Sequence, residues 1–195
     1  TAPAVADPVS GYLYVSSHTA CSAVQLVPGE EADTQYEKPT GTTYSAYANG
    51  PSAGSPRHPA DIPLYKPPYS RITAIDMNTG EHAWMIPTGE TPARVKNNPA
   101  LQGIDIGNTG TGNLVPMVVT PSMLVYSDVA TDGTPLLYAI NKATGDIEAS
   151  IEVPARSRYG MSTWVHDGHQ YIMLQTGATL TAMALPAAAP EAGGH

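Results

Sequence analysis

The sequence has little positive charge, a single cysteine and no long apolar run. It carries 9 Lys and Arg against 17 Asp and Glu, a formal net charge of −8. Such a surface repels nucleic acid and anionic lipid, which excludes nucleic acid as a partner. Cys21 cannot form an internal disulfide, so we interpret it as a buried or idle thiol; the alternative is a partner in sequence beyond this chain. No apolar stretch approaches the roughly 18 residues needed to span a membrane.

Several common catalytic and metal-binding patterns are missing too. No Cys/His set has zinc spacing, and no G-x-S-x-G nucleophile elbow occurs. His166 and His169 have a metal-like spacing, but the Asp-Gly pair between them predicts an exposed hairpin tip. His18 lies close to Cys21, yet nothing else supports a nucleophile there. The sequence therefore offers no metal ligand set and no nucleophile.

Proline and glycine, in contrast, are abundant, with 19 Pro and 18 Gly. Because each of them interrupts a helix, this density favours short strands joined by turns. Hydrophobic residues make up 42% of the chain, which predicts a globular protein rather than a disordered one. The 195 residues are enough for one domain with a real core.

A strand–turn–strand pattern occurs three times along the chain. Residues 71–84 contain the first copy, residues 137–149 the second, and residues 180–185 a truncated third. Trp84 ends the first copy and can pack a large flat surface between layers. The second copy has Ala149 at this position, which weakens the same contact there.

The turns of the two complete copies have matching chemistry. Gly80 and Gly145 supply the positive φ that a tight reversal needs. Asp76 and Asn141 can each hydrogen-bond the backbone of their own turn. We therefore expect two closely similar hairpins.

Each copy follows a second hairpin, so the repeating unit has four antiparallel strands, which is typical of a β-propeller blade. We predict an all-β fold, a partial β-propeller over residues 1–186. The predicted blades cover residues 4–87, 114–154 and 160–186, with an insertion at 28–66 in the first blade and a flexible tail at 187–195. The insertion is rich in Pro, Gly, Thr and Tyr, and loops of this length are functional or disordered.

The predicted blades do not close a ring, because propellers use roughly 4–8 blades and the third one here lacks its fourth strand. An open arc would expose apolar flanks and bare strand edges. We therefore expect the remaining blades to come from the same or another chain, with Thr1 as a truncation point.

Segment 74–84, AIDMNTGEHAW, resembles the tryptophan-docking repeat of quinoproteins that use pyrroloquinoline quinone (PQQ), with Ala74, Asp76, Gly80 and Trp84 at the motif positions. Segments 67–80 and 86–89 are similar to the glucose/quinate dehydrogenase branch, and segment 159–174 is similar to its last blade. The resemblance covers nearly the whole chain. It implies the C-terminal blades of an eight-bladed propeller.

The resemblance also implies the chemistry. It implies PQQ on the propeller axis, a divalent cation, usually calcium, between cofactor and protein, and oxidation of a sugar or alcohol with electrons passed to ubiquinone or a cytochrome. It implies a periplasmic location, with attachment to the inner membrane through an N-terminal segment outside this chain. Residues 175–179 are much shorter than the Gly-rich, His-containing loop of the glucose dehydrogenases, so the resemblance does not extend to glucose itself. No segment matches the motif of the family's catalytic aspartate, and we assign no catalytic residue.

Two connections between predicted blades are candidates for cofactor contacts, since in propellers the link from an outer strand to the next inner strand lies on the cofactor face. Within the glycine-rich segment 107–113, Asn108, Thr109 and Asn113 offer amides and a hydroxyl for carboxylates or a hard cation. The alternative is a turn-rich connector that binds no ligand.

The second connection is segment 154–160. Arg156 or Arg158 could pair with a PQQ carboxylate through a bidentate fork, and Tyr159 could line the pocket. The alternative is a solvated arginine pair.

We therefore predict part of a PQQ-dependent dehydrogenase, inactive as an isolated fragment. One rival is a non-enzymatic propeller scaffold or partner-binding module with PQQ-like repeats, which would not bind PQQ. A second rival is a small subunit that completes a propeller with a larger chain, which would co-purify with that partner.

Overall fold

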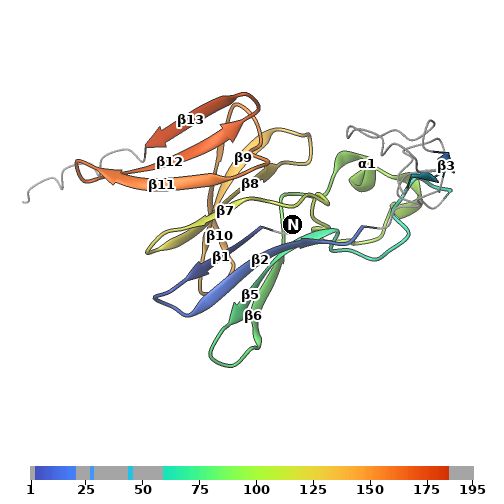
Figure 1. Cartoon of the computed structure of the whole chain (residues 1–195). Coiled ribbons are helices and arrows are strands. Elements are labelled where there is room, and N and C mark those ends of the chain that lie inside the picture. The colour runs from blue at the N-terminus through green and yellow to red at the C-terminus, as the bar shows by residue number, and fades with distance from the viewer. Residues whose placement is uncertain (1–2, 21–26, 29–43, 46–58, 185–195) are drawn as a thin grey trace, which may run out of the picture.

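The computed structural model describes residues 3–20, 27–28, 44–45 and 59–184. Within this part of the chain, three antiparallel sheets fan out beside a lobe of loops (Figure 1). The prediction of an all-β fold is confirmed. Cys21, most of the predicted insertion and the predicted tail lie outside the described residues.

The first sheet has the strand order β1-β2-β5-β6. Its strands are β1 (Ala4–Asp7), β2 (Tyr12–His18), β5 (Ser70–Asp76) and β6 (His82–Pro87). The long connection between β2 and β5 contains β3 (Val27–Pro28) and β4 (Tyr44–Ser45), which pair with each other.

The second sheet has the strand order β7-β8-β9-β10, and the third has the order β11-β12-β13. The second contains β7 (Met117–Val119), β8 (Met123–Val129), β9 (Pro135–Asn141) and β10 (Ile147–Glu152). The third contains β11 (Met161–His166), β12 (His169–Thr176) and β13 (Thr179–Ala184). Each sheet lies within one predicted blade range, so we call the three sheets the first, second and third blades.

The predicted turn chemistry is confirmed in both complete copies of the repeat. Gly80 and Gly145 have φ of +77° and +83°. The Asp76 carboxylate accepts the backbone N–H of Asn78 at 2.8 Å. Asn141 accepts the N–H of Ala143 through its Oδ1 at 3.0 Å. The hairpins therefore form locally, from residues that the sequence already shows.

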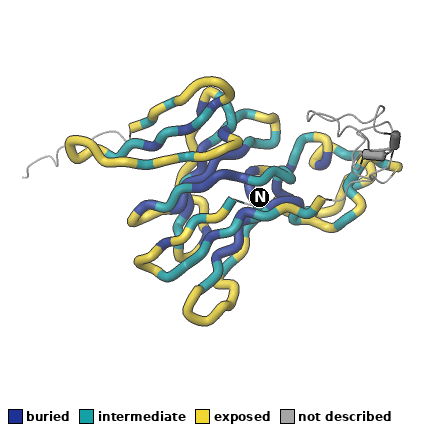
Figure 2. Tube along the Cα trace, viewed as in Figure 1, coloured by how far each residue is buried: buried dark blue, intermediate teal, exposed yellow. Residues whose placement is uncertain are grey.

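Apolar side chains fill the spaces between neighbouring blades. Tyr14 and Ile72 from the first blade and Leu124 and Ile140 from the second are fully buried in one cluster. A smaller cluster, which includes Leu174, joins the second blade to the third. Figure 2 shows the buried positions concentrated between the sheets. Full burial of one such aliphatic side chain stabilises the fold by roughly 1.5–3 kcal/mol.

The connections between strands fall at two opposite ends of the blades. We call the end with the tight β1–β2, β5–β6, β7–β8, β9–β10 and β11–β12 turns the turn end. We call the other the loop end; it carries the long β2–β5 and β6–β7 connections and the β8–β9, β10–β11 and β12–β13 links. The β6–β7 connection contains α1 (Ala93–Lys96) and a 3-10 turn (Pro99–Leu101), which the sequence did not predict. No helix in the described part of the chain has the length and apolar character to cross a bilayer.

Trp84 joins the first two blades at the turn end, as the repeat predicts. Its indole N–H donates to the carbonyl oxygen of Lys142 at 3.1 Å. The Tyr14 ring lies beside it, with centroids 5.6 Å apart. A Cβ on Gly145 would approach the indole ring to 2.9 Å, so glycine is required for this close packing.

The equivalent space between the second and third blades is open. Ala149 pairs with Ala139 in the register in which Trp84 pairs with Ala74. A largely apolar groove of about 180 Å³ lies there, with Ala149, Ile151 and Ile172 among its lining residues. Ala149 does not supply the ring that Trp84 places between the first two blades.

Candidate functional site

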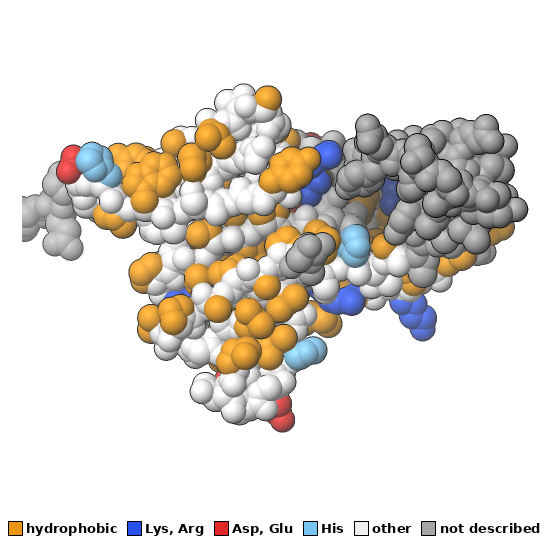
Figure 3. Space-filling model, viewed as in Figure 1, with side chains coloured by type: hydrophobic (Ala, Val, Ile, Leu, Met, Phe, Trp, Pro, Cys, Tyr) orange, Lys and Arg blue, Asp and Glu red, His pale blue; other side chains and the backbone are white. Residues whose placement is uncertain are grey.

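Basic side chains are concentrated at the loop end. The described Lys and Arg residues at this end are Lys66, Arg71, Arg94, Lys96, Arg156 and Arg158. Lys142 lies at the turn end, where it pairs with Asp7 at 2.6 Å. In Figure 3 most of the visible basic side chains lie toward the lobe, and acidic ones mark the turn tips. The loop end also carries six described carboxylates, so its described charges balance, whereas the turn end has one cation against six carboxylates. An anionic ligand would therefore be repelled less by the loop end than by the turn end.

The six loop-end cations form no ion pair with a carboxylate within 4.0 Å among the described residues, although the charge of Arg156 acts on Asp128. Among the described residues, Lys142 is the only Lys or Arg that forms an ion pair with a carboxylate. Arg71 instead donates to the Thr19 hydroxyl at 3.1 Å and to the Pro68 carbonyl at 3.3 Å. Guanidinium groups without a carboxylate partner remain able to bind one from a ligand.

The glycine-rich segment of the β6–β7 connection folds onto the start of β5. The Ser70 hydroxyl accepts the N–H of Gly112 at 2.9 Å and the Thr88 hydroxyl at 2.7 Å. A Cβ on Gly110, where φ is +70°, would lie 2.6 Å from the Ser70 carbonyl oxygen. The glycine at position 110 thus lets the segment lie close against the protein's own strand.

The side chains of Asn108 and Thr109 form hydrogen bonds within the β6–β7 connection. Asn108 donates to the carbonyl of Gly89 at 2.8 Å and accepts the N–H of Gly110 at 2.9 Å. Thr109 is buried, and its hydroxyl donates to the carbonyl of Gly110 at 3.1 Å. In this structure both residues shape the loop.

Asn113 is held by a residue that sequence reasoning missed. Its side-chain Nδ2 donates to Asp128 Oδ1 at 2.8 Å. The Thr111 hydroxyl donates to the other carboxylate oxygen of Asp128 at 2.7 Å, and the N–H of Asn113 donates to Thr111 Oγ1 at 3.2 Å. Together the three side chains form a closed polar cluster at the loop end of β8.

Asp128 is fully buried within this cluster. Burial raises the pKa of its carboxyl group, while the hydrogen bonds from Thr111 and Asn113 and the charge of Arg156 act in the opposite direction. Gly89 approaches so closely that a Cβ there would lie 2.8 Å from Asp128 Oδ2. The absence of a side chain at Gly89 therefore leaves room for the Asp128 carboxylate.

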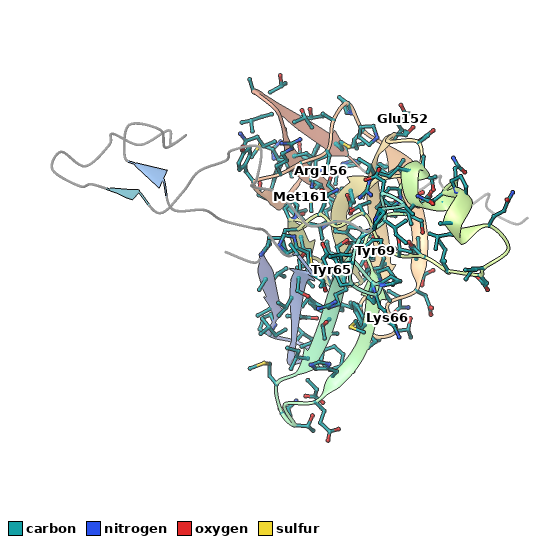
Figure 4. All side chains as sticks on the ribbon, turned by 90° about the vertical axis from the view of Figure 1, so that its right-hand side faces the viewer. Tyr65, Lys66, Tyr69, Glu152, Arg156 and Met161 are labelled. Atoms are coloured by element: carbon teal, nitrogen blue, oxygen red, sulfur yellow. The ribbon has the colours of Figure 1, made fainter. Side chains whose placement is uncertain are left out.

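The β10–β11 connection carries the arginines. Arg156 is half-buried, and its guanidinium donates to the carbonyl of Leu114 at 3.4 Å. Arg158 and Tyr159 are exposed. Figure 4, which faces the loop end, shows Arg156 and Met161 in the central region together with Tyr65 and Tyr69.

A repeated serine contact attaches each connection to the preceding blade. The Ser16 hydroxyl on β2 accepts the N–H of Val115 at 3.0 Å. The Ser127 hydroxyl on β8 accepts the N–H of Ser157 at the same distance. The two serines occupy equivalent positions in the strand pairings. Both candidate loops are therefore anchored to the preceding blade by the same type of hydrogen bond, from a backbone N–H to a serine hydroxyl.

Two cavities lie in the lobe beside these loops. One of about 210 Å³ is mainly apolar, with Tyr65, Tyr69 and Val95 in its lining. Another, of about 440 Å³, is more polar and includes Glu90 and Lys96. The larger of the two falls within the usual range of small-molecule pockets, roughly 300–1,000 Å³.

The three histidines that the sequence analysis singled out do not lie together. His166 and His169 lie at the tip of the β11–β12 hairpin at the turn end, and both are exposed, as predicted. His18 is exposed near the Gly112 carbonyl, 3.2 Å away. No group of three or more His, Cys, Asp or Glu within the described ranges is placed to hold a metal ion.

Comparison with known proteins gives one family and several relatives. Residues 2–172 match the family described as PQQ: Glucose/ethanol/alcohol dehydrogenase, beta-propeller domain. The glycerol dehydrogenase large subunits of Gluconobacter thailandicus and Gluconobacter oxydans (strain 621H) are each 31% identical over 192 residues, covering 88% of this chain and 25% of theirs. This chain thus spans a quarter of the length of those relatives.

Among solved structures, the quinohemoprotein alcohol dehydrogenase from Comamonas testosteroni is similar over 90% of this chain and 22% of its own, with 18% identity and a TM-score of 0.48. The family match extends through both complete blades and into the third. The predicted partial propeller and the predicted resemblance are therefore confirmed, and this chain belongs to the β-propeller domain family of the PQQ-dependent glucose, ethanol and alcohol dehydrogenases.

Proposed function

We propose that this chain forms part of a PQQ-dependent dehydrogenase and that its loop end contacts the cofactor. The observation that carries the proposal is the set of six cations at that end, without a carboxylate partner among the described residues, in a chain of this family. The described charges of the loop end balance, whereas the turn end has one cation against six carboxylates and repels anions more strongly.

The residues present fit the chemistry of PQQ, which is a planar tricarboxylate. Arg158 is exposed and free to form a bidentate pair with one carboxylate. Arg156 is anchored at Leu114 by one hydrogen bond, which leaves most of its donors available. Tyr159, also exposed, offers an aromatic face to a flat ring. Asn108 and Thr109 support the loop, and Asn113 offers its Oδ1.

The cofactor and the residues of this chain would have different roles in the reaction. When bound, PQQ supplies the two-electron oxidation of the substrate. The residues of this chain bind its carboxylates, orient its plane and exclude water on one side. No described residue is assigned as the general base.

The substrate we propose is an alcohol, a polyol or a sugar. The named relatives are glycerol dehydrogenase subunits, which favours a small polyol. The remaining parts of the proposal rest on the family resemblance alone: calcium beside PQQ, ubiquinone or a cytochrome as electron acceptor, further blades from the same or another chain, and a periplasmic location.

The test is reconstitution of the full-length apoprotein with PQQ, with and without calcium. We expect saturable binding, followed by dye reduction with glycerol, ethanol or glucose, and the ranking of the three names the substrate class. Absence of both binding and turnover would contradict the proposal. That result would favour a propeller scaffold that holds protein partners.

A further inference from the structure

Asp128 fixes which end of the Asn113 amide is open to a ligand. A carboxylate oxygen accepts hydrogen bonds, so the Nδ2 of Asn113 must face it, and the two groups are 2.8 Å apart. The Oδ1 of Asn113 then points away from Asp128. No described residue donates to this oxygen, and no buried side-chain oxygen or nitrogen among the described residues lacks a partner, so it is open to solvent.

The cluster holds Asn113 from both sides. Thr111 donates its hydroxyl proton to Asp128 at 2.7 Å and accepts the backbone N–H of Asn113 at 3.2 Å. Asp128 is inaccessible to solvent, so water cannot replace it as the acceptor. A flipped Asn113 amide would place its Oδ1 against a carboxylate oxygen of Asp128, and two acceptors repel each other. The observed orientation of the amide is therefore favoured.

The residue is particular to the second blade. Asp128 on β8 pairs with Leu136, and Ser17 on β2 pairs with Arg71. These two pairings are equivalent. Leu136 follows Arg71 in the sequence by the same number of residues as Gly145 follows Gly80, and these two glycines are corresponding positions of the repeat. Serine is too short to reach an amide as Asp128 does. The aspartate thus adds a contact that the general blade architecture does not need.

We propose that Asp128 is a positioning residue, which orients the Asn113 amide so that its oxygen is presented to the ligand bound at the loop end. The proposal rests on the proposed function, in which that ligand is PQQ. The oxygen would accept a hydrogen bond from the ring N–H of PQQ or contribute to the coordination of a cation beside it.

The test is equilibrium binding of PQQ to the full-length apoprotein and to four variants. We expect Asp128→Ala and Asn113→Ala each to weaken binding about tenfold, because each removes one well-oriented hydrogen bond. Because Asp128 acts through Asn113, the double variant should bind no more weakly than Asn113→Ala. Asp128→Asn should stay within about threefold of the wild type, since its amide oxygen still accepts from Asn113.

The matched control is Asp132→Ala, an exposed carboxylate in the β8–β9 link that follows, which should bind as the wild type does. Circular dichroism checks that each variant is folded. If Asp128→Ala does not fold, Asp128→Ser, the residue of the first blade at this position, should give the same loss.

Unchanged binding in Asp128→Ala or Asp128→Ser would overturn the inference, as would losses in the single variants that multiply in the double variant. Failure of the wild-type apoprotein to bind PQQ would overturn the proposed function, and this inference with it. Wild-type binding with unaffected variants would overturn only the inference.

Discussion

The indole N–H of Trp84 donates to the carbonyl oxygen of Lys142 across 3.1 Å, from the outer strand of one blade to a turn of the next. The same oxygen accepts the Tyr14 hydroxyl at 2.9 Å, and the Lys142 ammonium group pairs with Asp7 at 2.6 Å. One residue of the second blade thus binds three residues of the first. The turn end therefore holds these two blades together.

Replacing Trp84 should destabilise the fold. We expect Trp84→Ala to lower the free energy of unfolding by about 3 kcal/mol, because it removes a large packed ring and leaves the Lys142 carbonyl with one donor fewer. Trp164→Ala is the matched control, because Trp164 is 40% exposed and stacks on Tyr171 within one sheet. Guanidinium unfolding of the full-length protein measures both, and equal losses would contradict the docking role.

Two glycines with similar φ separate backbone strain from packing. Gly145 (φ +83°) lies against the Trp84 ring, whereas Gly133 (φ +92°) has nothing within 4 Å of an added Cβ. Gly133→Ala should cost about 1 kcal/mol from the left-handed backbone alone. Gly145→Ala should cost about 2 kcal/mol more, because the indole must move. Equal losses of unfolding free energy in the two variants, measured with denaturant, would show that the indole ring moves aside without an energetic cost.

The ion pair between Asp7 and Lys142 should make stability depend on pH in the acid range. The hydrogen bond from Lys142 lowers the pKa of the Asp7 carboxyl to about 2, against the opposing effect of burial. Since the folded state favours the ionised form, the contribution is complete above the ordinary aspartate pKa and is lost as the pH falls from about 4 to about 2.

The measurement is the difference in unfolding free energy between the wild type and Asp7→Asn at several pH values. It should be roughly 2 kcal/mol at pH 6 and should shrink as the pH falls toward 2. A difference that stays constant over this range would mean that the pair does not stabilise the folded state through its charge.

The groove beside Ala149 should accept the side chain that the first blade has. We expect Ala149→Trp to raise the free energy of unfolding by about 1 kcal/mol, because the ring covers apolar surface of β9 and β12. Ala149→Leu should give a smaller gain, since it fills less of the 180 Å³. Thermal unfolding ranks the three proteins. A loss of stability with both substitutions would show that the groove is already occupied in the full-length protein.

The blades could be predicted from the sequence because their determinants are local. Gly80 and Gly145, with Asp76 and Asn141 before them, specify each turn within a few residues. Alternating apolar residues then specify the flanking strands. Trp84 was predicted to dock for the same reason, since the repeat places it at a fixed distance from its turn.

The loop-end cluster could not be predicted, because its contacts depend on the path of a long connection. Asp128 lies in a strand that reads as apolar, and Asn113 precedes it by 15 residues. Nothing local pairs them; the loop brings Asn113 over the end of β8 after anchoring at Ser70. The one-turn helix α1 was missed because Ala93–Lys96 is too short for a periodic pattern. An Asp at the end of a strand facing a Thr-x-Asn segment was the available signal.

Binding of PQQ at the loop end is the property on which the proposed function depends most directly. The measurement is the affinity of PQQ for the full-length apoprotein, compared with that of the Arg158→Ala variant. We predict saturable binding by the wild type and at least about tenfold weaker binding by the variant, the effect of losing one charged hydrogen-bonding pair. No binding by the wild type would contradict the dehydrogenase proposal, and equal affinities would contradict the role of Arg158.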